Sequence, residues 1–188
     1  RALSHVVLWR STEYPPPPFE VASTLRSRRR ISATVYDLPG AMHGRHLLVA
    51  KESVPDGAAV VQDGLFLGSA RGLSFGSALV TSFVASRQDW NLLFLPDDET
   101  GSPVELHGRV TRSEGNAAWI EWTGPSRDEL SRLGSGYLFT GSNGQFCPAR
   151  LWIGRASIDP VARNLIKVDV WAPAGPRTAA VIVGEISQ

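Results

Sequence analysis

Short apolar runs rich in β-branched and aromatic residues recur along the chain, and turn residues separate them. Apolar and polar residues alternate strictly over residues 104–111, which predicts a strand with one buried face. Glu114, Gly115 and Asn116 follow as a turn, and a second apolar run covers residues 117–123. The two runs are therefore predicted to form a β-hairpin.

The C-terminal segment, residues 165–188, has the same character. Pro173, Gly175 and Pro176 split it into two apolar runs, so it is predicted to form a strand, a turn and a further strand. Residues 55–57, Pro-Asp-Gly, predict another turn earlier in the chain.

Helix signals occur at residues 126–133. Ser126 is an N-cap residue, Glu129 is its capping-box partner, and Gly134 ends the helix. Elsewhere about a dozen short strands alternate with turns at intervals of ~8–12 residues, a pattern typical of β-sandwiches and barrels. The sequence therefore predicts an all-β fold, namely a two-sheet antiparallel β-sandwich with one short helix.

The N-terminal segment has a different composition from the rest of the chain. Residues 15–18 are four consecutive prolines, which impose an extended polyproline II conformation. Residues 1–18 are therefore predicted to form an extended arm, and residues 19–188 a single sandwich domain.

The composition is that of a globular protein, with 43% hydrophobic and 20% charged residues among 188. No apolar run reaches the ~20 residues that span a bilayer, and no signal-peptide pattern is evident. Cys147 is the single cysteine, which excludes an internal disulfide. The six tryptophans lie mainly in predicted strands, where a sandwich core or a subunit interface explains them better than base stacking.

Arginine dominates the basic residues, because Lys51 and Lys167 are the only lysines among 19 basic positions. The densest charge cluster has three interpretations that the sequence leaves open. It binds phosphate groups of a nucleic acid or another ligand, it pairs with acidic residues of a neighbouring subunit, or it coats a solvated loop. The members of this cluster are Arg26, Arg28, Arg29 and Arg30.

The histidines do not form a pattern typical of a metal site. His43 and His46 lie close together as H-G-R-H, whereas His5, His107 and Cys147 lie far away in the sequence. A zinc site needs three or four ligands at characteristic spacings. No metal is therefore predicted.

Two further short segments are candidates for a catalytic site or a metal site. Residues 72–76, G-L-S-F-G, match the letters of the serine-hydrolase nucleophile elbow, but that motif needs a helix after the serine and none is predicted there. Asp97, Asp98 and Glu99 form an acidic loop, which is interpreted as a solvated connection because calcium needs six or more oxygens. The sequence therefore predicts no catalytic residue, no enzyme activity and no cofactor.

The C-terminal half resembles the jelly-roll coat proteins of small icosahedral RNA viruses, including plant and picorna-like viruses. The resemblance rests on A-A-W-I-E-W-T-G-P-S before a short helix, on G-Y-L-F-T-G, and on the closing K-V-D-V-W-A-P and A-A-V-I-V-G-E-I. The size, the start without Met and the final glutamine are compatible with such a protein cut from a polyprotein.

This resemblance implies a structural capsid subunit of a virion, assembled in the host cytoplasm. Copies of the chain, with or without other coat chains, would form an icosahedral shell around RNA, and Arg26, Arg28, Arg29 and Arg30 would contact the packaged RNA.

A second resemblance, to the PilZ β-barrel domain, supplies the alternative function of binding cyclic diguanylate. Arg26 and Arg30 match its R-x-x-x-R motif, followed by I-S-A-T-V. Its second motif, D/N-x-S-x-x-G, fails around Ser74, because Gly72 and Ser77 stand where the motif needs an acid or amide and a glycine.

Overall fold

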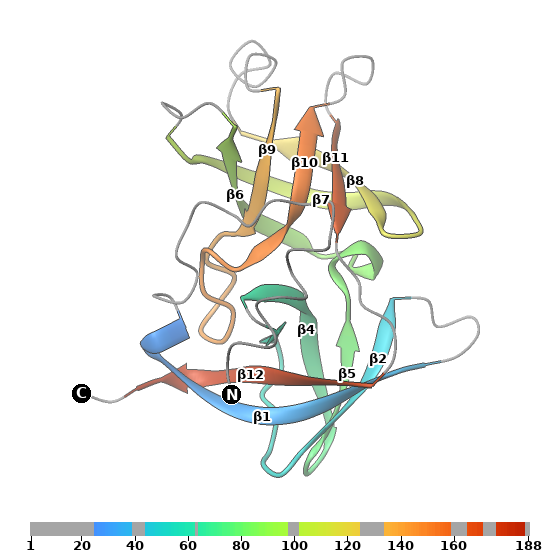
Figure 1. Ribbon diagram of the computed structural model, residues 1–188, viewed down its shortest axis with the longest axis vertical. Helices are drawn as coiled ribbons and strands as arrows, with labels where there is room; N and C mark the ends of the chain where they lie inside the picture. Colours follow the sequence, from blue (N-terminus) through green and yellow to red (C-terminus); the bar gives the residue numbers. More distant parts are fainter. Residues whose placement is uncertain are drawn as a thin grey trace, which may run out of the picture.

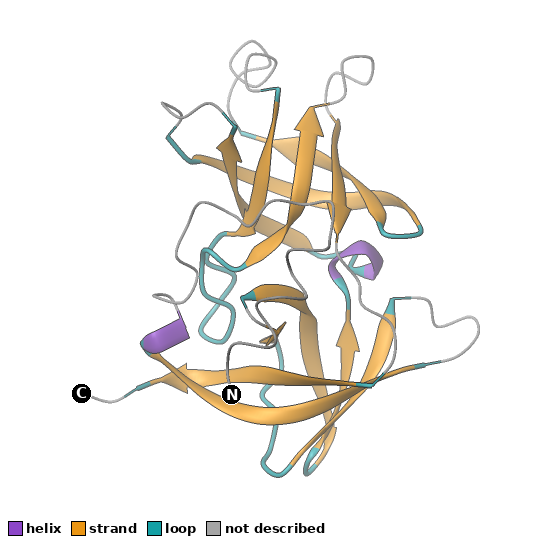
Figure 2. Ribbon diagram, viewed as in Figure 1, coloured by secondary structure: helices purple, strands orange, loops and turns teal. Residues whose placement is uncertain are grey.

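The computed structural model describes residues 25–38, 44–62, 64–97, 102–124, 134–158, 165–170 and 176–186. Within these ranges the regular backbone is almost all β-strand, with a helical turn at residues 25–26 and a 3-10 turn, η1, at Phe83–Ala85 (Figure 2). The predicted all-β class is confirmed. The predicted arm, its boundary at Phe19 and the predicted helix at residues 126–133 lie outside the described residues.

Twelve strands are present in the described part of the chain. They are β1 (Arg28–Asp37), β2 (Arg45–Ala50), β3 (Ala58–Gln62), β4 (Leu65–Ser74), β5 (Ser77–Thr81), β6 (Asp89–Pro96), β7 (Val104–Glu114), β8 (Ala117–Thr123), β9 (Ser135–Thr140), β10 (Trp152–Ile158), β11 (Leu165–Val170) and β12 (Arg177–Glu185). No helix in these ranges has the length and apolar character needed to cross a membrane.

The strands close into two six-stranded rings. The continuous order is β11-β8-β7-β6-β9-β10-β4-β3-β12-β1-β2-β5, and the additional pairings β11–β10 and β4–β5 each close one ring. We call the ring of β1–β5 and β12 the first barrel, and the ring of β6–β11 the second barrel; they are the lower and upper parts of Figure 1. Closed rings replace the two facing sheets predicted from the sequence, because both candidate edges find a partner.

The strands predicted from local pattern are present, but one predicted pairing is wrong. β7 and β8 form the predicted antiparallel hairpin, with Glu114 opposite Ala117. β11 and β12 do not pair with each other. β11 pairs with β8 and β10, which closes the second barrel, whereas β12 pairs with β1 and β3 in the first barrel. The C-terminal segment therefore connects the two barrels and is not a hairpin.

A shared wall separates two hydrophobic cores. In β3, Ala58 and Val60 belong to the core of the first barrel, whereas Ala59 and Val61 belong to the cluster that fills the second barrel. Successive residues of a strand point to opposite faces, so a run of four buried apolar residues is buried on both sides. The outer face of the first barrel at β3 therefore packs against the second barrel.

Aromatic residues fill the junction between the barrels. Trp90, at the start of β6, is 1% exposed, and its ring lies 5.5 Å from those of Phe66 and Phe83. Phe83 comes from η1, the connection from β5 to β6. The Trp90 indole N–H donates a hydrogen bond to Ser86 Oγ at 3.2 Å, which satisfies its one polar atom.

A glycine lies in or directly beside each closing ladder for steric reasons. A Cβ on Gly68 of β4 would lie 2.3 Å from the carbonyl oxygen of Thr81, and one on Gly154 of β10 would lie 2.2 Å from that of Asp169. Both contacts are far inside van der Waals distance, so a side chain at either position would push the paired strand away.

Candidate functional site

The arginine cluster predicted from the sequence lies at the start of the first barrel, and the structure divides it in two. Arg28 pairs with Glu185 of β12 at 2.8 Å, and Arg29 pairs with Glu52 at 2.9 Å. Arg26 and Arg30 line a cavity. The guanidinium groups of Arg28 and Arg29 thus serve ion pairs within the barrel, and phosphate binding by the cluster stays a prediction.

This cavity has a volume of about 1230 Å³ and opens at the outside of β1, β12 and the end of β3. Small or apolar residues form its floor and walls, among them Ser32, Val61, Thr178 and Ala180. We call it the arginine groove, because Arg26, Arg30 and Arg177 line it.

Charge is unequal between the barrels. Among the described residues, the first barrel with its adjoining turns carries eight Lys and Arg against four Asp and Glu, whereas the second carries six of each. The first barrel therefore has a formal charge of +4 in the described ranges and the second is neutral. An anionic partner would accordingly be attracted to the first barrel.

The outside of the first barrel also carries an apolar face. Tyr36 of β1, Leu47 of β2 and Leu79 of β5 are direct neighbours across three strands. Val49, on β2, is 45% exposed beside them. Leu73 and Phe75, at the β4–β5 hairpin, are 56% and 77% exposed, and this hairpin points away from the second barrel (Figure 1). We call these six residues the apolar face.

Exposed apolar side chains of this size are confined to one barrel. Every large hydrophobic residue that is exposed in the described ranges belongs to the first barrel or directly follows β12, where Ile186 lies. Adjacent exposed apolar residues of this kind mark interaction surfaces more often than isolated ones do. The apolar face is therefore a candidate interface.

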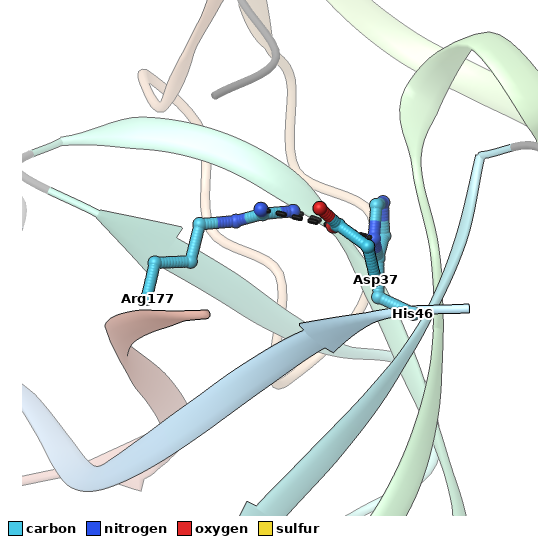
Figure 3. A network of polar contacts seen from close by, with 3 residues as sticks. All are labelled: Asp37, His46 and Arg177. Carbon is cyan, nitrogen blue, oxygen red and sulfur yellow. Dashed lines mark hydrogen bonds and ion pairs between the residues drawn. The ribbon is translucent and has the colours of Figure 1, made fainter. Parts of the chain in front are cut away.

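A polar network ties the open end of the first barrel together. Arg177 of β12, whose side chain is 7% exposed, pairs with Asp37 of β1 at 3.0 Å, and Asp37 also contacts His46 Nδ1 of β2 at 2.9 Å (Figure 3). Arg177 Nη2 lies 3.3 Å from the same nitrogen. Three strands are thereby joined by polar contacts, and His46 belongs to this network.

The remaining sequence candidates are structural. Ser74 lies at the end of β4, its hydroxyl is 2.7 Å from that of Ser77, and β5 follows where a nucleophile elbow would need a helix. His107 contacts Asn91 Oδ1 at 2.6 Å. In the described ranges no three His, Cys, Asp or Glu side chains are grouped as metal ligands would be. Asp98, Glu99, His5 and His43 lie outside those ranges.

Two titratable groups in the second barrel have shifted pKa values. Hydrogen bonds from the Arg155 guanidinium lower the pKa of Asp97, against the opposing effect of partial burial. Burial raises the pKa of the Cys147 thiol to about 12, which makes the thiol unreactive at neutral pH. Both shifts follow from ion pairing and burial within the second barrel.

No family model matches the sequence, and no curated protein matches it. Solved structures do match the fold. The major periplasmic domain of the cell shape-determining filament MreC is 12% identical, with a TM-score of 0.57 over 85% of this chain and 98% of that one. MreC from Pseudomonas aeruginosa is 10% identical, with a TM-score of 0.60 over 82% of this chain and 99% of that one.

MreC from Listeria monocytogenes is 11% identical, with a TM-score of 0.59 over 98% of this chain and 87% of that one. At these identities the likeness concerns the fold. It corrects both resemblances drawn from the sequence: the neighbours are MreC domains, not viral coat proteins or cyclic-diguanylate-binding domains. The icosahedral capsid, the packaged RNA and the virion location are wrong for the same reason. The chain has the double-barrel fold that these MreC domains share.

Proposed function

We propose that this chain is a domain of a bacterial cell-shape protein that works outside the cytoplasmic membrane as a structural scaffold. The observation that carries the proposal is the fold likeness over nearly the whole chain to MreC domains, one of them described as the periplasmic domain of a cell shape-determining filament. A six-stranded ring inserted into another is a specific arrangement, and the likeness covers 85% of this chain and 98% of the periplasmic domain of that filament protein.

Assembly through the first barrel is the second part of this proposal. The apolar face gives the chain a surface that gains free energy when it is covered, at about 25 cal/mol per Å² of apolar area removed from water. Tyr36, Leu47 and Leu79 form one continuous row across adjacent strands, and Phe75 is exposed at the β4–β5 hairpin. A copy of the chain presents the same row, so two copies can bury it against each other.

The scaffold role requires no catalysis. Ser74, the one serine that the sequence brought forward as a nucleophile, has a neighbouring serine hydroxyl as its contact. We therefore propose a non-enzymatic role, in which shape and surfaces carry the function.

Deletion of the gene in its own bacterium tests the role in cell shape. We expect rod-shaped cells to widen or round up, as seen by phase-contrast microscopy, and the wild-type gene to restore cell width. Cells that keep their shape and width after deletion would contradict the proposal.

A surface variant of the purified protein tests assembly separately. Phe75→Glu combined with Leu73→Glu places two charges on the apolar face, so it is expected to shift the purified protein to smaller species in analytical ultracentrifugation. Thr123→Glu, at an exposed position on β8 of the second barrel, is the control and should leave the distribution unchanged. Unchanged assembly of the double variant would overturn the role of the apolar face while leaving the role in cell shape to the deletion experiment.

A further inference from the structure

The arginine groove begins where a β-ladder ends. β12 and β3 pair at only two positions, Ala180 with Val61 and Val181 with Val60. Beyond them, Thr178 and Ala179 pair with β1 on one side and have no bridge on the side of β3 within the described ranges. Thr178, Ala179 and Gln62 all line the groove, so the backbone edge of β12 lies along it.

An edge of this kind can accept a further extended segment. Strand addition satisfies the free backbone groups of the edge strand and is a common mode of peptide recognition. The groove also has the size for it, because about 1230 Å³ exceeds the upper end of ordinary small-molecule pockets. Its small floor residues, Ser32, Thr178 and Ala180, leave room for side chains of a bound strand.

A polar atom at the end of β3 needs a hydrogen-bond donor. Gln62 lines the groove, and its Oε1 atom is buried without a hydrogen-bond partner. A buried acceptor without a partner destabilises the folded state. The terminal torsion of glutamine rotates easily. Oε1 can therefore turn to accept a hydrogen bond from a backbone N–H of a bound peptide. The phosphodiester groups of a nucleic acid offer no such donor, whereas the backbone of a peptide does.

The charge of the groove selects an acidic partner. Arg30 is exposed and, unlike Arg28 and Arg29, has no ion pair or side-chain hydrogen bond within the described ranges. Arg26 lines the groove beside it. Arginine forks bind carboxylates bidentately, and the first barrel has an excess of basic residues around them.

From these contacts we infer that the arginine groove binds an extended acidic peptide segment of a partner protein by strand addition to β12. The backbone of the peptide pairs along Thr178 and Ala179, one of its N–H groups is met by Gln62, and its carboxylates contact Arg30 and Arg26. This site lies on the opposite side of β1 from the strands β2 and β5 of the apolar face, so it stands independently of the proposed scaffold role.

Peptide binding to the full chain tests the inference. The probe is a fluorescein-labelled decapeptide in which Glu alternates with Val and Thr, followed by fluorescence anisotropy. We expect saturable binding, about tenfold weaker binding when Lys replaces Glu, and a similar loss when alternate backbone nitrogens are methylated. Hydrogen exchange should show protection of one of the two amides, Thr178 or Ala179, when the peptide is bound, because successive N–H groups of a strand point to opposite edges.

Variants locate the site. Arg30→Ala is expected to weaken peptide binding at least fivefold, because it removes one of two carboxylate contacts from an exposed position. Arg29→Ala is the matched control on the same strand, since Arg29 does not line the groove, and it should change binding less than twofold.

Three outcomes would overturn the inference. Equal affinity of the N-methylated peptide would show that charge alone binds it. Displacement of the peptide by pyrophosphate or oligouridylate at equal concentration would assign the groove to phosphate ligands. Absence of any saturable binding would show that the groove does not accept a separate peptide.

Discussion

The two barrels have the same number of strands, but they are closed in different ways. The second barrel uses six strands that follow one another in the sequence, β6 to β11, whereas the first needs β12 to reach back to β1. The ion pair of Arg28 with Glu185 joins residues 157 positions apart. The second barrel is thus an insertion between β5 and β12 of the first. Because non-local pairing carries the larger loop-closure cost, the second barrel can close before the first.

The two barrels also differ on their outer surfaces. The second is neutral in the described ranges, and cation–π contacts such as Arg112 on Trp119 and Arg155 on Tyr137 cover parts of its outside. The first has a net positive charge, the apolar face and the arginine groove. Both candidate interaction surfaces, the apolar face and the arginine groove, therefore lie on the first barrel.

The largest expected effect is at the junction where the two cores meet. Trp90→Ala removes a fully buried ring that packs on Phe66 and Phe83, so it is expected to lower the free energy of unfolding by about 3–5 kcal/mol. Urea denaturation followed by circular dichroism measures this loss. Thiol labelling of buried Cys147 reports opening of the second barrel, and hydrogen exchange of β1 reports opening of the first.

Trp119→Ala is the control for this change. Trp119 is only partly buried, and its main contact is the Arg112 guanidinium 4.5 Å above the ring, so a loss of about 1 kcal/mol is expected. If Trp90→Ala left the stability of the first barrel unaffected, the two barrels would be independent and the shared wall would not couple them.

A smaller effect is expected at the glycines of the two closing ladders. Gly68→Ala and Gly154→Ala each place a Cβ against a backbone carbonyl, and overpacking of this kind costs about 1–3 kcal/mol. Hydrogen exchange should show faster exchange of β4 and β5 in the first variant, and of β10 and β11 in the second. The contrast between the barrels is clearer if Gly68→Ala also speeds the hydrogen exchange of β12 and Gly154→Ala does not.

Gly115→Asn serves as the control for both glycine variants. Gly115 has φ +56° with open space around its Cβ position, and asparagine tolerates that backbone conformation. Its stability should stay within about 0.5 kcal/mol of wild type. A comparable loss in all three variants would show that the close approaches do not determine closure.

The smallest expected effect concerns the ion pair of Asp97 with Arg155 in the second barrel. Asp97→Asn is expected to cost about 0.2–1 kcal/mol at pH 7, because both side chains are partly exposed and solvent screens the pair. The pKa of Asp97 is lowered in the folded state. Its contribution is therefore complete above the ordinary value of 3.8 and is lost as the pH falls through the lowered folded-state pKa.

Urea midpoints at pH 7 and at pH 2 measure this dependence. The difference between wild type and Asp97→Asn should shrink at the lower pH. Glu114→Gln, which removes a more exposed pair with Arg112, should differ from wild type at neither pH. A difference for Asp97→Asn that grows on acidification would contradict the assigned cause.

Much of the local structure followed from the sequence. Alternation over residues 104–111 predicted β7, and the Glu114-Gly115-Asn116 turn predicted its hairpin with β8. The turn at Pro55-Asp56-Gly57 is also present, with Gly57 at φ +77° and Asp56 accepting a hydrogen bond from the Gly72 amide. Each of these signals involves residues within a few positions of one another, so the chain need not be folded for them to be read.

The arginine cluster shows the limit of such signals for the candidate site. The sequence identified Arg26, Arg28, Arg29 and Arg30 as a group, but their division into ion pairs and groove depends on Glu52 and Glu185, which are distant in the sequence. No sequence pattern marked the groove itself. Gln62 and Thr178 look like ordinary strand residues in the sequence, and they line a groove only because the pairing of β3 with β12 ends beside them.

What the sequence determined by itself was the strand content and the local turns, because a period of two residues and turn chemistry act within short segments. The pairing of the strands, by contrast, depends on the tertiary structure. The same alternation serves a sandwich and a barrel, so it predicted the strands of residues 165–188 and misjudged their pairing. Those two strands belong to different rings because each pairs with a strand that is distant in the sequence. β12 pairs with β1 in the first barrel, and β11 pairs with β8 in the second.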